Sequence, residues 1–346
     1  MYSFLNDYSE GAHERIIKAL ADTNREQTVG YGEDEYCERA RALIKARLGG
    51  ADADVHFLVG GTQANMTLIS SALRPHQGVV SASSGHINVH ESGAVEATGH
   101  KVLAVESADG LLYAADVKRL LDAHWADPSR EHTVQPAMVY ISHPSELGTL
   151  YSKAHLEELS ALCRERGLFL FLDGARLGCA LTAPGSDVTL ADLAALTDAF
   201  YIGGTKMGAL LGEALVITND ALKKDFRYHI KQRGGMLAKG RLLGIQFEEL
   251  FRDELYFELA RHANAMAKRL ADACSKAGCD FLVPTESNQL FPIFSRADYE
   301  ALTRGFLLTW WADLPDGRVA VRLCASWATE EAAVAAFESA LASLAR

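Results

Sequence analysis

LFLFLDGAR, residues 168–176, begins with five consecutive apolar residues and ends in an acid, a glycine, an alanine and an arginine. A continuous apolar run of this length is typical of a strand that is buried on both faces of a parallel sheet. Asp173 then stands at the carboxyl end of the strand, where open α/β sheets bind their ligands. A buried carboxylate needs a cation or several hydrogen-bond donors. We therefore interpret Asp173 either as half of a structural ion pair with Arg176 or as a functional acid.

Short apolar runs alternate with amphipathic patterns of helical period from about residue 55 to residue 218. The runs that we predict as strands are Val55–Val59, Gly78–Ala82, Lys101–Val105, Ala137–Ser142, Leu168–Leu172, Ala199–Ile202 and Ala209–Ile217. The clearest predicted helices are Gln63–Leu73, Ala115–Ala123 and Lys153–Arg166. Strands that alternate with helices indicate parallel pairing and an α/β domain in layers.

The pattern changes after residue 218. Residues 220–277 are almost wholly helical in composition, and shorter strand and helix signals follow them. We expect a mainly parallel α/β domain, followed by a smaller α+β domain. The predicted divisions are an N-terminal arm and helix over residues 1–30, the large domain over residues 31–245 and the small domain over residues 246–346.

Composition excludes several classes of protein. The chain has 346 residues and a net charge of −11, which argues against non-specific binding to nucleic acid or to an anionic membrane surface. Its apolar runs are strand-sized and fall well short of the roughly 18 residues of a membrane span. The six cysteines include no CxxC pair, and no signal peptide is visible. We therefore expect reduced thiols and a cytoplasmic protein.

Two glycine-rich segments follow predicted strands. Gly60–Asn65, GGTQAN, opens a helix, so the free amides of Gly61 and Thr62 predict an anion site at its positive end. The alternative is an ordinary turn with Thr62 as the N-cap residue. Lys206 lies in GGTKMG, and its surroundings of small and apolar residues favour a nucleophilic amine over a surface lysine.

The phosphate site, the carboxylate of Asp173 and the amine of Lys206 fall at one predicted sheet edge. Pyridoxal phosphate needs this set, because its phosphate must be held, its aldehyde forms a Schiff base with a lysine and its ring nitrogen takes an acidic partner. Each motif alone is weak evidence. The three in this order predict a pyridoxal-phosphate site.

Four segments together resemble the threonine aldolase group of the β-eliminating lyase superfamily, which are fold-type I pyridoxal-phosphate enzymes. The segments are GGTQAN at residues 60–65, HINVHESGA at 86–94, FLDGARL at 171–177 and YIGGTKMGA at 201–209. The resemblance implies an aldehyde-lyase that cleaves L-threonine, L-allo-threonine or phenylserine-type substrates to glycine and an aldehyde. It also implies a homodimer or homotetramer with shared active sites.

The resemblance implies roles for individual residues. Lys206 matches the Schiff-base lysine, and Asp173 matches the partner of the pyridine nitrogen. Gly61 and Thr62 match the phosphate-binding pair. His86 matches the histidine that stacks on the cofactor ring and helps in proton transfer.

Further matches concern the substrate. Arg176, which lies in the cofactor-binding motif, and Arg322 match the arginines that grip the substrate carboxylate, a task suited to a bidentate guanidinium. Tyr31 matches a tyrosine near the active site that the neighbouring subunit often contributes.

The chain also departs from the family pattern. Asn6 stands where many members have a serine that contacts the substrate carboxylate, and His90 stands where many have an aromatic residue. A further family histidine has no clean counterpart, although His143 is near it. The distal phosphate-binding cation is Lys231, Arg233 or Lys239, of which we favour Lys231. These departures bear more on substrate choice than on cofactor binding.

Other interpretations remain open at this stage. His86 and His90 have the spacing of zinc ligands, but the glutamate of an HExxH motif is missing, so we expect no metal site. The same scaffold also supports β-elimination or racemisation. A non-catalytic ligand-binding homologue is the alternative of another class. Retention of Lys206, Asp173, His86 and Arg322 together argues against it.

Overall fold

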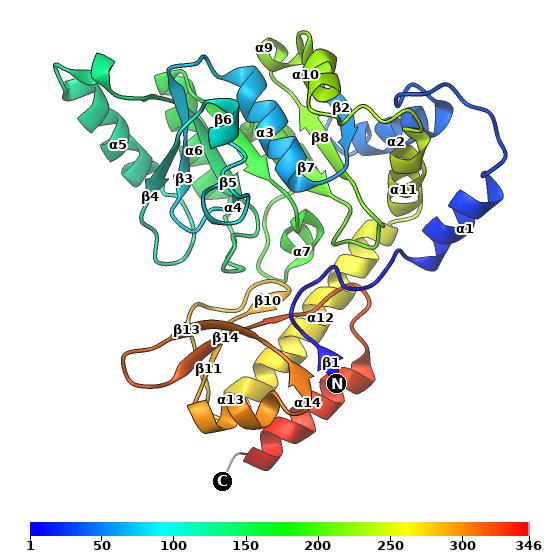
Figure 1. Ribbon diagram of the computed structural model, residues 1–346, viewed down its shortest axis with the longest axis vertical. Helices are drawn as coiled ribbons and strands as arrows, with labels where there is room; N and C mark the ends of the chain where they lie inside the picture. Colours follow the sequence, from blue (N-terminus) through cyan, green and yellow to red (C-terminus); the bar gives the residue numbers. More distant parts are fainter. Residues whose placement is uncertain (345–346) are drawn as a thin grey trace.

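The computed structural model describes residues 1–344, and a seven-stranded sheet forms the centre of its larger lobe (Figure 1). The strands in spatial order are β2 (Asp54–Leu58), β8 (Glu213–Ile217), β7 (Ala199–Gly203), β6 (Phe169–Asp173), β5 (Gln135–Ser142), β3 (Gln77–Ala82) and β4 (Val102–Val105). Only β8 runs antiparallel to its neighbours. The prediction of a mainly parallel α/β domain is confirmed.

Strand β8 begins later than the apolar run predicts. The run starts at Ala209, but the chain enters the strand only at Glu213. Gly208 and Gly212 have φ angles of 90° and 125°, a region that side chains rarely adopt, and they turn the chain before the strand begins. As a result, an acid and not an apolar residue opens this strand.

Helices cover both faces of the large sheet, and the alternation of side chains decides which face each residue serves. In β6, Leu170 and Leu172 belong to one buried cluster and Phe171 to the other. The first face carries α2 (Glu35–Lys45), α5 (Ala114–Ala126), α6 (Lys153–Arg166), α7 (Leu177–Thr182), α8 (Leu190–Leu196) and α11 (Arg241–Arg252). The second carries α3 (Gly61–Ala72), α4 (His86–Val89), α9 (Asp220–Lys223) and α10 (Phe226–Gln232).

The 22-residue helix α12 (Leu255–Lys276) leads from the larger lobe to the smaller one (Figure 1). Tyr256 and Ala260, in its first half, pack in the core of the larger lobe, whereas Leu270 and Cys274 pack in that of the smaller lobe. One rigid helix thus belongs to both cores. None of the described helices, α12 included, is both long and apolar enough to cross a membrane.

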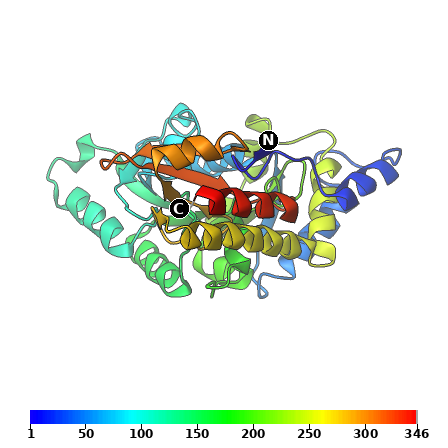
Figure 2. The same ribbon diagram turned by 90° about the horizontal axis from the view of Figure 1, so that it is seen from below.

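The smaller lobe combines a sheet with two helices. Its strands are β9 (Asp280–Phe281), β10 (Gln289–Leu290), β11 (Pro292–Phe294), β13 (Thr309–Asp313) and β14 (Val319–Cys324). Strand β14 pairs antiparallel with β10, β11 and β13. The helices are α13 (Arg296–Leu302) and α14 (Glu331–Leu344), and α14 lies beside α12 (Figure 2).

The N-terminal arm belongs to both lobes. Strand β1 (Tyr2–Ser3) pairs in parallel with β12 (Phe306–Leu307) of the smaller lobe. The chain then crosses to the larger lobe, where α1 (Glu14–Asp22) packs near α11. Residues 4–13 therefore pass between the lobes. The division of the chain into an arm, a large domain and a small domain at residues 30 and 245 stays a prediction.

Candidate functional site

The strand directions bring the predicted motifs to one edge of the large sheet. Strands β2, β6 and β7 end at this edge, and the antiparallel β8 starts there, since Glu213 is paired with both Leu58 and Gly203. A cavity of about 220 Å³ lies at this edge. Its lining includes the predicted residues Gly61, Thr62, His86, Asp173, Arg176 and Lys206.

Two motif glycines allow the ends of β6 and β7 to approach each other. The Gly203 amide donates a hydrogen bond of 2.9 Å to the Gly174 carbonyl. A Cβ on Gly174 would lie 1.9 Å from the Tyr201 carbonyl oxygen, and one on Gly203 would lie 2.3 Å from that of Ala175. Backbone oxygens cannot move aside cheaply, so only glycine fits at either position.

Gly174→Ala is expected to lower the free energy of unfolding by about 1–3 kcal/mol, because the added methyl group must push the two strand ends apart. Urea unfolding measures this loss. Gly185→Ala is the matched control, since a Cβ there meets no atom within 4 Å. Equal stability of the two variants would refute the close-approach argument.

Hydrogen-bond donors, and not Arg176, surround the Asp173 carboxylate. Tyr140 Oη and Asn65 Nδ2 both donate to Oδ2, the latter over 3.2 Å, and the Ala175 amide donates to Oδ1 over 3.0 Å. Burial alone would raise the pKa of Asp173, but the charge that His86 carries when protonated and the hydrogen bonds from Tyr140, Tyr201 and the Ala175 amide together outweigh it, and the pKa is lowered. Asp173 is therefore a buried, ionised acid. The structural Asp173–Arg176 pair, one of the two sequence-based interpretations, is wrong.

Arg176 instead forms a buried ion pair with Asp7 of the N-terminal arm. Its Nε and Nη2 donate to Asp7 Oδ2 and Oδ1 over 2.6 and 3.0 Å. Asn288 Nδ2, from the smaller lobe, donates to the same carboxylate over 2.9 Å. Burial would raise the pKa of Asp7, but the charges of Arg176 and Lys206 and the hydrogen bonds from Arg176 and Asn288 together outweigh it, so the pKa is lowered. This ion pair joins the arm and both lobes beside the cavity.

Asp7→Ala is expected to lower the free energy of unfolding at pH 7 by about 3–5 kcal/mol, because it leaves a buried guanidinium without its partner. The pKa of Asp7 in the folded chain lies below its ordinary value of 3.8. Its stabilisation is therefore complete above that pH and is lost as the pH falls through the folded value. Urea unfolding at pH 7 and in acid should show that the free energies of unfolding of wild type and Asp7→Ala differ less in acid than at pH 7.

An exposed ion pair provides the control for the Asp7 measurement. Asp122 and Lys118 are exposed partners on α5, so Asp122→Ala should cost no more than about 1 kcal/mol. A loss at Asp7 as small as that at Asp122 would show that the buried pair does not join the lobes.

Lys206 lies three residues after the end of β7 and is one of the residues that line the cavity. In the described part of the chain, no side chain or carbonyl forms a hydrogen bond or ion pair with its amine. The pKa of Lys206 is lowered by burial and by the charge of Arg176, against the opposing charges of Asp7, Asp173 and Glu213. More of this amine is therefore neutral, and so nucleophilic, than in an exposed lysine.

Glu213 is a site residue that the sequence analysis missed. It opens β8, lines the cavity and accepts a hydrogen bond of 3.1 Å from Thr205 Oγ1. Burial raises the pKa of Glu213 to about 8, although the charge of Lys206 opposes the rise. The signal in the sequence is the acid that opens EALVI. It was overlooked because Glu213 falls inside the predicted apolar run Ala209–Ile217.

His86 begins α4 and is held by two acids. Its ring Nδ1 lies 2.7 Å from Glu91 Oε1, and its backbone amide donates to Glu146 Oε1 over 2.8 Å. The His90 ring centre is 5.5 Å away, and burial lowers the pKa of His90. Among residues 1–344, no group of three or more His, Cys, Asp or Glu is arranged to hold a metal ion.

Arg322 approaches the site from β14 of the smaller lobe. Its Nη2 donates to the Leu5 carbonyl of the arm over 3.0 Å, and its Nε has no partner in the described part of the chain. Its charge acts on the His90 imidazole together with those of Arg176 and Lys206. Arg322 therefore lies near His90 but is not part of the cavity lining, and its unpartnered Nε is buried.

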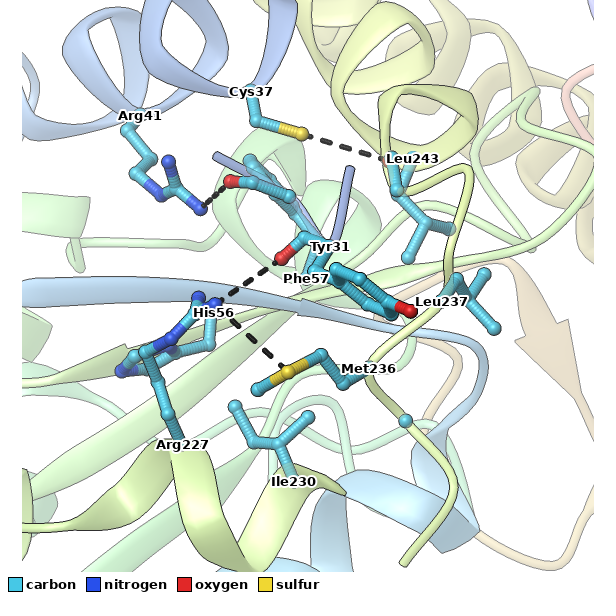
Figure 3. Close-up of a pocket in the computed structure, with 13 residues that line it drawn as sticks. Tyr31, Cys37, Arg41, His56, Phe57, Arg227, Ile230, Met236, Leu237 and Leu243 are labelled. Atoms are coloured by element: carbon cyan, nitrogen blue, oxygen red, sulfur yellow. Dashed lines mark hydrogen bonds between the residues drawn. The ribbon is translucent and has the colours of Figure 1, made fainter. Parts of the chain in front are cut away.

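Tyr31 and Lys231 lie outside the cavity that contains Lys206. Tyr31 lines a second, small pocket (Figure 3). Arg41 Nη2 and Arg227 Nη2 donate to the carbonyls of Gly32 and Tyr31, over 2.5 and 3.4 Å. These bonds hold Tyr31 at a φ of 62°, with 47% of the residue exposed. Lys231 Nζ is 4.7 Å from the centre of its ring. Neither residue lines the cavity with Lys206.

The remaining candidates are also outside the cavity lining. Asn6 Oδ1 accepts hydrogen bonds from the Tyr8 amide and Ser9 Oγ in a local turn. The buried His143 accepts one from the Tyr151 amide over 3.4 Å, and burial lowers the pKa of His143 to about 4. Arg233 and Lys239 lie between α10 and α11.

Comparison with known proteins shows the family. The model of the family described as beta-eliminating lyase matches residues 4–296. This chain belongs to the beta-eliminating lyase family. The resemblance inferred from the motifs is thus confirmed.

Two relatives within the beta-eliminating lyase group align over nearly the whole chain. The low specificity L-threonine aldolase of Pseudomonas aeruginosa is 30% identical over 335 residues, with 94% of this chain and 93% of the relative covered. The solved structure of Leishmania major threonine aldolase is 49% identical with a TM-score of 0.97, and the match covers all of both chains.

A more distant structural match shows the fold alone. Thermus thermophilus aspartate aminotransferase has a TM-score of 0.72 at 17% identity, and the match covers 99% of this chain and 91% of that one. The fold-type I architecture expected from the motifs is therefore confirmed.

Proposed function

We propose that this chain is a pyridoxal-phosphate-dependent aldolase that cleaves L-β-hydroxy-α-amino acids to glycine and an aldehyde. The observation that carries the proposal is one cavity holding an unpaired amine, a buried ionised acid and a histidine. The chain that contains them is 49% identical to a threonine aldolase of known structure.

The cavity residues fit pyridoxal phosphate. Helix α3 begins at this cavity without a side-chain cap, so the amides of Gly61 and Thr62 are free to hold a phosphate. Lys206 would bind the cofactor covalently, and Asp173 would accept a hydrogen bond from the protonated nitrogen of its ring. When bound, the cofactor supplies an electron sink for the pair released from the substrate Cα–Cβ bond.

The chain's own residues would bind and orient the substrate. Arg322 would hold the α-carboxylate with its guanidinium. Arg176 is partly engaged by Asp7, so we assign it a smaller share of this contact. His86 would take the proton of the β-hydroxyl group, and Asp173 would stabilise positive charge at the ring nitrogen.

Product analysis tests the proposed function. Purified chain loaded with pyridoxal phosphate is given L-threonine, L-allo-threonine and L-phenylserine in parallel, and glycine and aldehyde are measured. Equal amounts of both products from any substrate are expected, and the ranking shows whether the pocket favours a methyl group or a ring. Cofactor-loaded protein that releases aldehyde from none of them would contradict the proposal.

We also propose that the working enzyme is a homodimer or homotetramer in the cytoplasm. Tyr31 and Lys231 are held away from the cavity of their own chain, with the Tyr31 ring partly exposed, and a second copy could use them. The free cysteines suit a reducing compartment. Light scattering that finds only a monomer would contradict shared sites.

A further inference from the structure

Glu91 is a buried acid that none of the roles above uses. It follows α4, and its side chain is 0% exposed. Its Oε1 lies 2.7 Å from His86 Nδ1 and accepts a hydrogen bond of 2.7 Å from Asn65 Nδ2. The same Asn65 nitrogen donates to Asp173 Oδ2 over 3.2 Å. Glu91 thus connects the histidine of the cavity with its buried acid.

We propose that Glu91 is a positioning residue that fixes the tautomer of His86 and neutralises the charge that His86 gains. The inference rests on the proposed aldolase function. An ionised carboxylate only accepts hydrogen bonds, so Nδ1 of His86 must carry the ring proton. A neutral imidazole has one N–H, which leaves the lone pair on Nε2 free for the cavity.

The negative charge matters when the proton moves. His86 Nε2 takes the proton of the β-hydroxyl group, and the O–H electron pair becomes the second bond of the aldehyde carbonyl as the Cα–Cβ bond breaks. The imidazole is then an imidazolium. Glu91 lies against its other nitrogen and is fully buried, and in a partly buried pair the attraction between opposite charges is stronger than in water.

Hydrogen bonding alone does not explain an acid at this position. A glutamine could accept the bonds from His86 and Asn65 through its amide oxygen, and Glu91 Oε2 has no partner within residues 1–344. A buried oxygen without a partner costs stability. What the acid adds over a glutamine is its charge beside the imidazole.

The test combines nitrogen NMR of the histidines with kinetics. The chain is labelled with ¹⁵N-histidine, and the His86 signals are assigned by their loss in His86→Asn. We expect wild type to show the Nδ1–H tautomer of His86 near neutral pH, with and without pyridoxal phosphate. Glu91→Gln should keep this tautomer, whereas Glu91→Ala should lose the preference.

The kinetic arm separates charge from hydrogen bonding. Glu91→Gln should lower kcat by about 10–100-fold, as loss of a supporting partner does at other sites, while KM stays close to that of wild type. Thermal unfolding checks that each variant is folded. Glu146→Gln is the matched control, because Glu146 accepts hydrogen bonds from the His86 backbone amide and from Ser142 Oγ but not from the His86 ring, and so should leave the tautomer unchanged.

Two results would overturn the proposal. One is a wild-type His86 that carries its proton on Nε2. The other is a Glu91→Gln variant with the kcat of wild type. Failure of the proposed aldolase function can be distinguished from both results. In that case the wild-type chain would release no aldehyde, while the tautomer signals would still report on Glu91.

Discussion

Lys206→Ala is expected to lower kcat by about 10³–10⁴-fold and to end covalent attachment of pyridoxal phosphate, because among residues 1–344 no other lysine lines the cavity. Burial and Arg176 lower the pKa of Lys206, which makes its amine the reactive one. Borohydride reduction of the loaded wild type should place a pyridoxyl group on the Lys206 peptide, and mass spectrometry detects it.

Lys223 provides the control for this experiment. Its amine pairs with Asp52 and Asp220 over 3.0 and 2.7 Å, and the bond to Asp220 raises the pKa of Lys223. Lys223→Ala should keep both turnover and the label on Lys206. A label on another lysine in wild type, or unchanged turnover in Lys206→Ala, would place the chemistry elsewhere.

Asp173→Asn is expected to lower kcat by about 10²–10³-fold, the cost of removing one group that stabilises charge in a transition state. The shape of the side chain is kept, and the Ala175 amide can still donate to its oxygen. What is lost is the buried negative charge that Tyr140 and Asn65 support. Affinity for pyridoxal phosphate should also fall, and fluorescence titration measures it.

Asp198 is an acid at the opposite edge of the same sheet and serves as the matched control. It lies just before β7 and accepts hydrogen bonds from the Leu170 amide and Asn219 Nδ2. Asp198→Asn should change stability and leave kcat of the folded enzyme as it is. If Asp173→Asn kept the kcat of wild type, Asp173 would not be the partner of the ring nitrogen.

The main architecture could be predicted because the central strands are buried on both faces. Strand β6, FLFLD, is apolar at every position before Asp173, and the neighbouring runs are similarly apolar. Strand β13 lacked such a signal, since Thr309–Asp313 is partly or fully exposed at every position and leaves no continuous buried run. Predictions from apolar patterns thus succeed where a strand has buried positions, including the edge strands β2 and β4, and fail where it has none.

The candidate site was predictable where its residues follow strands that end together. Asp173 ends the buried strand β6, Lys206 lies three residues after the end of β7, and parallel pairing of the two strands places both residues at one edge. The Asp7–Arg176 pair was not predictable in this way, because 169 residues separate the partners and the arm shows no periodic pattern. Because Asp173 is only three residues from Arg176, the sequence suggested it as the ion-pair partner, but in the fold the partner of Arg176 is the distant Asp7.

The most direct test of the account is the fate of the substrate carbon bonds in heavy water. L-phenylserine is cleaved in D₂O by the loaded enzyme, and the early products are analysed by mass spectrometry. Cleavage of Cα–Cβ predicts benzaldehyde and an equal amount of glycine that has gained one deuterium at Cα. A 2-oxo acid with ammonia, or recovered phenylserine that carries deuterium without any aldehyde, would contradict the aldolase function.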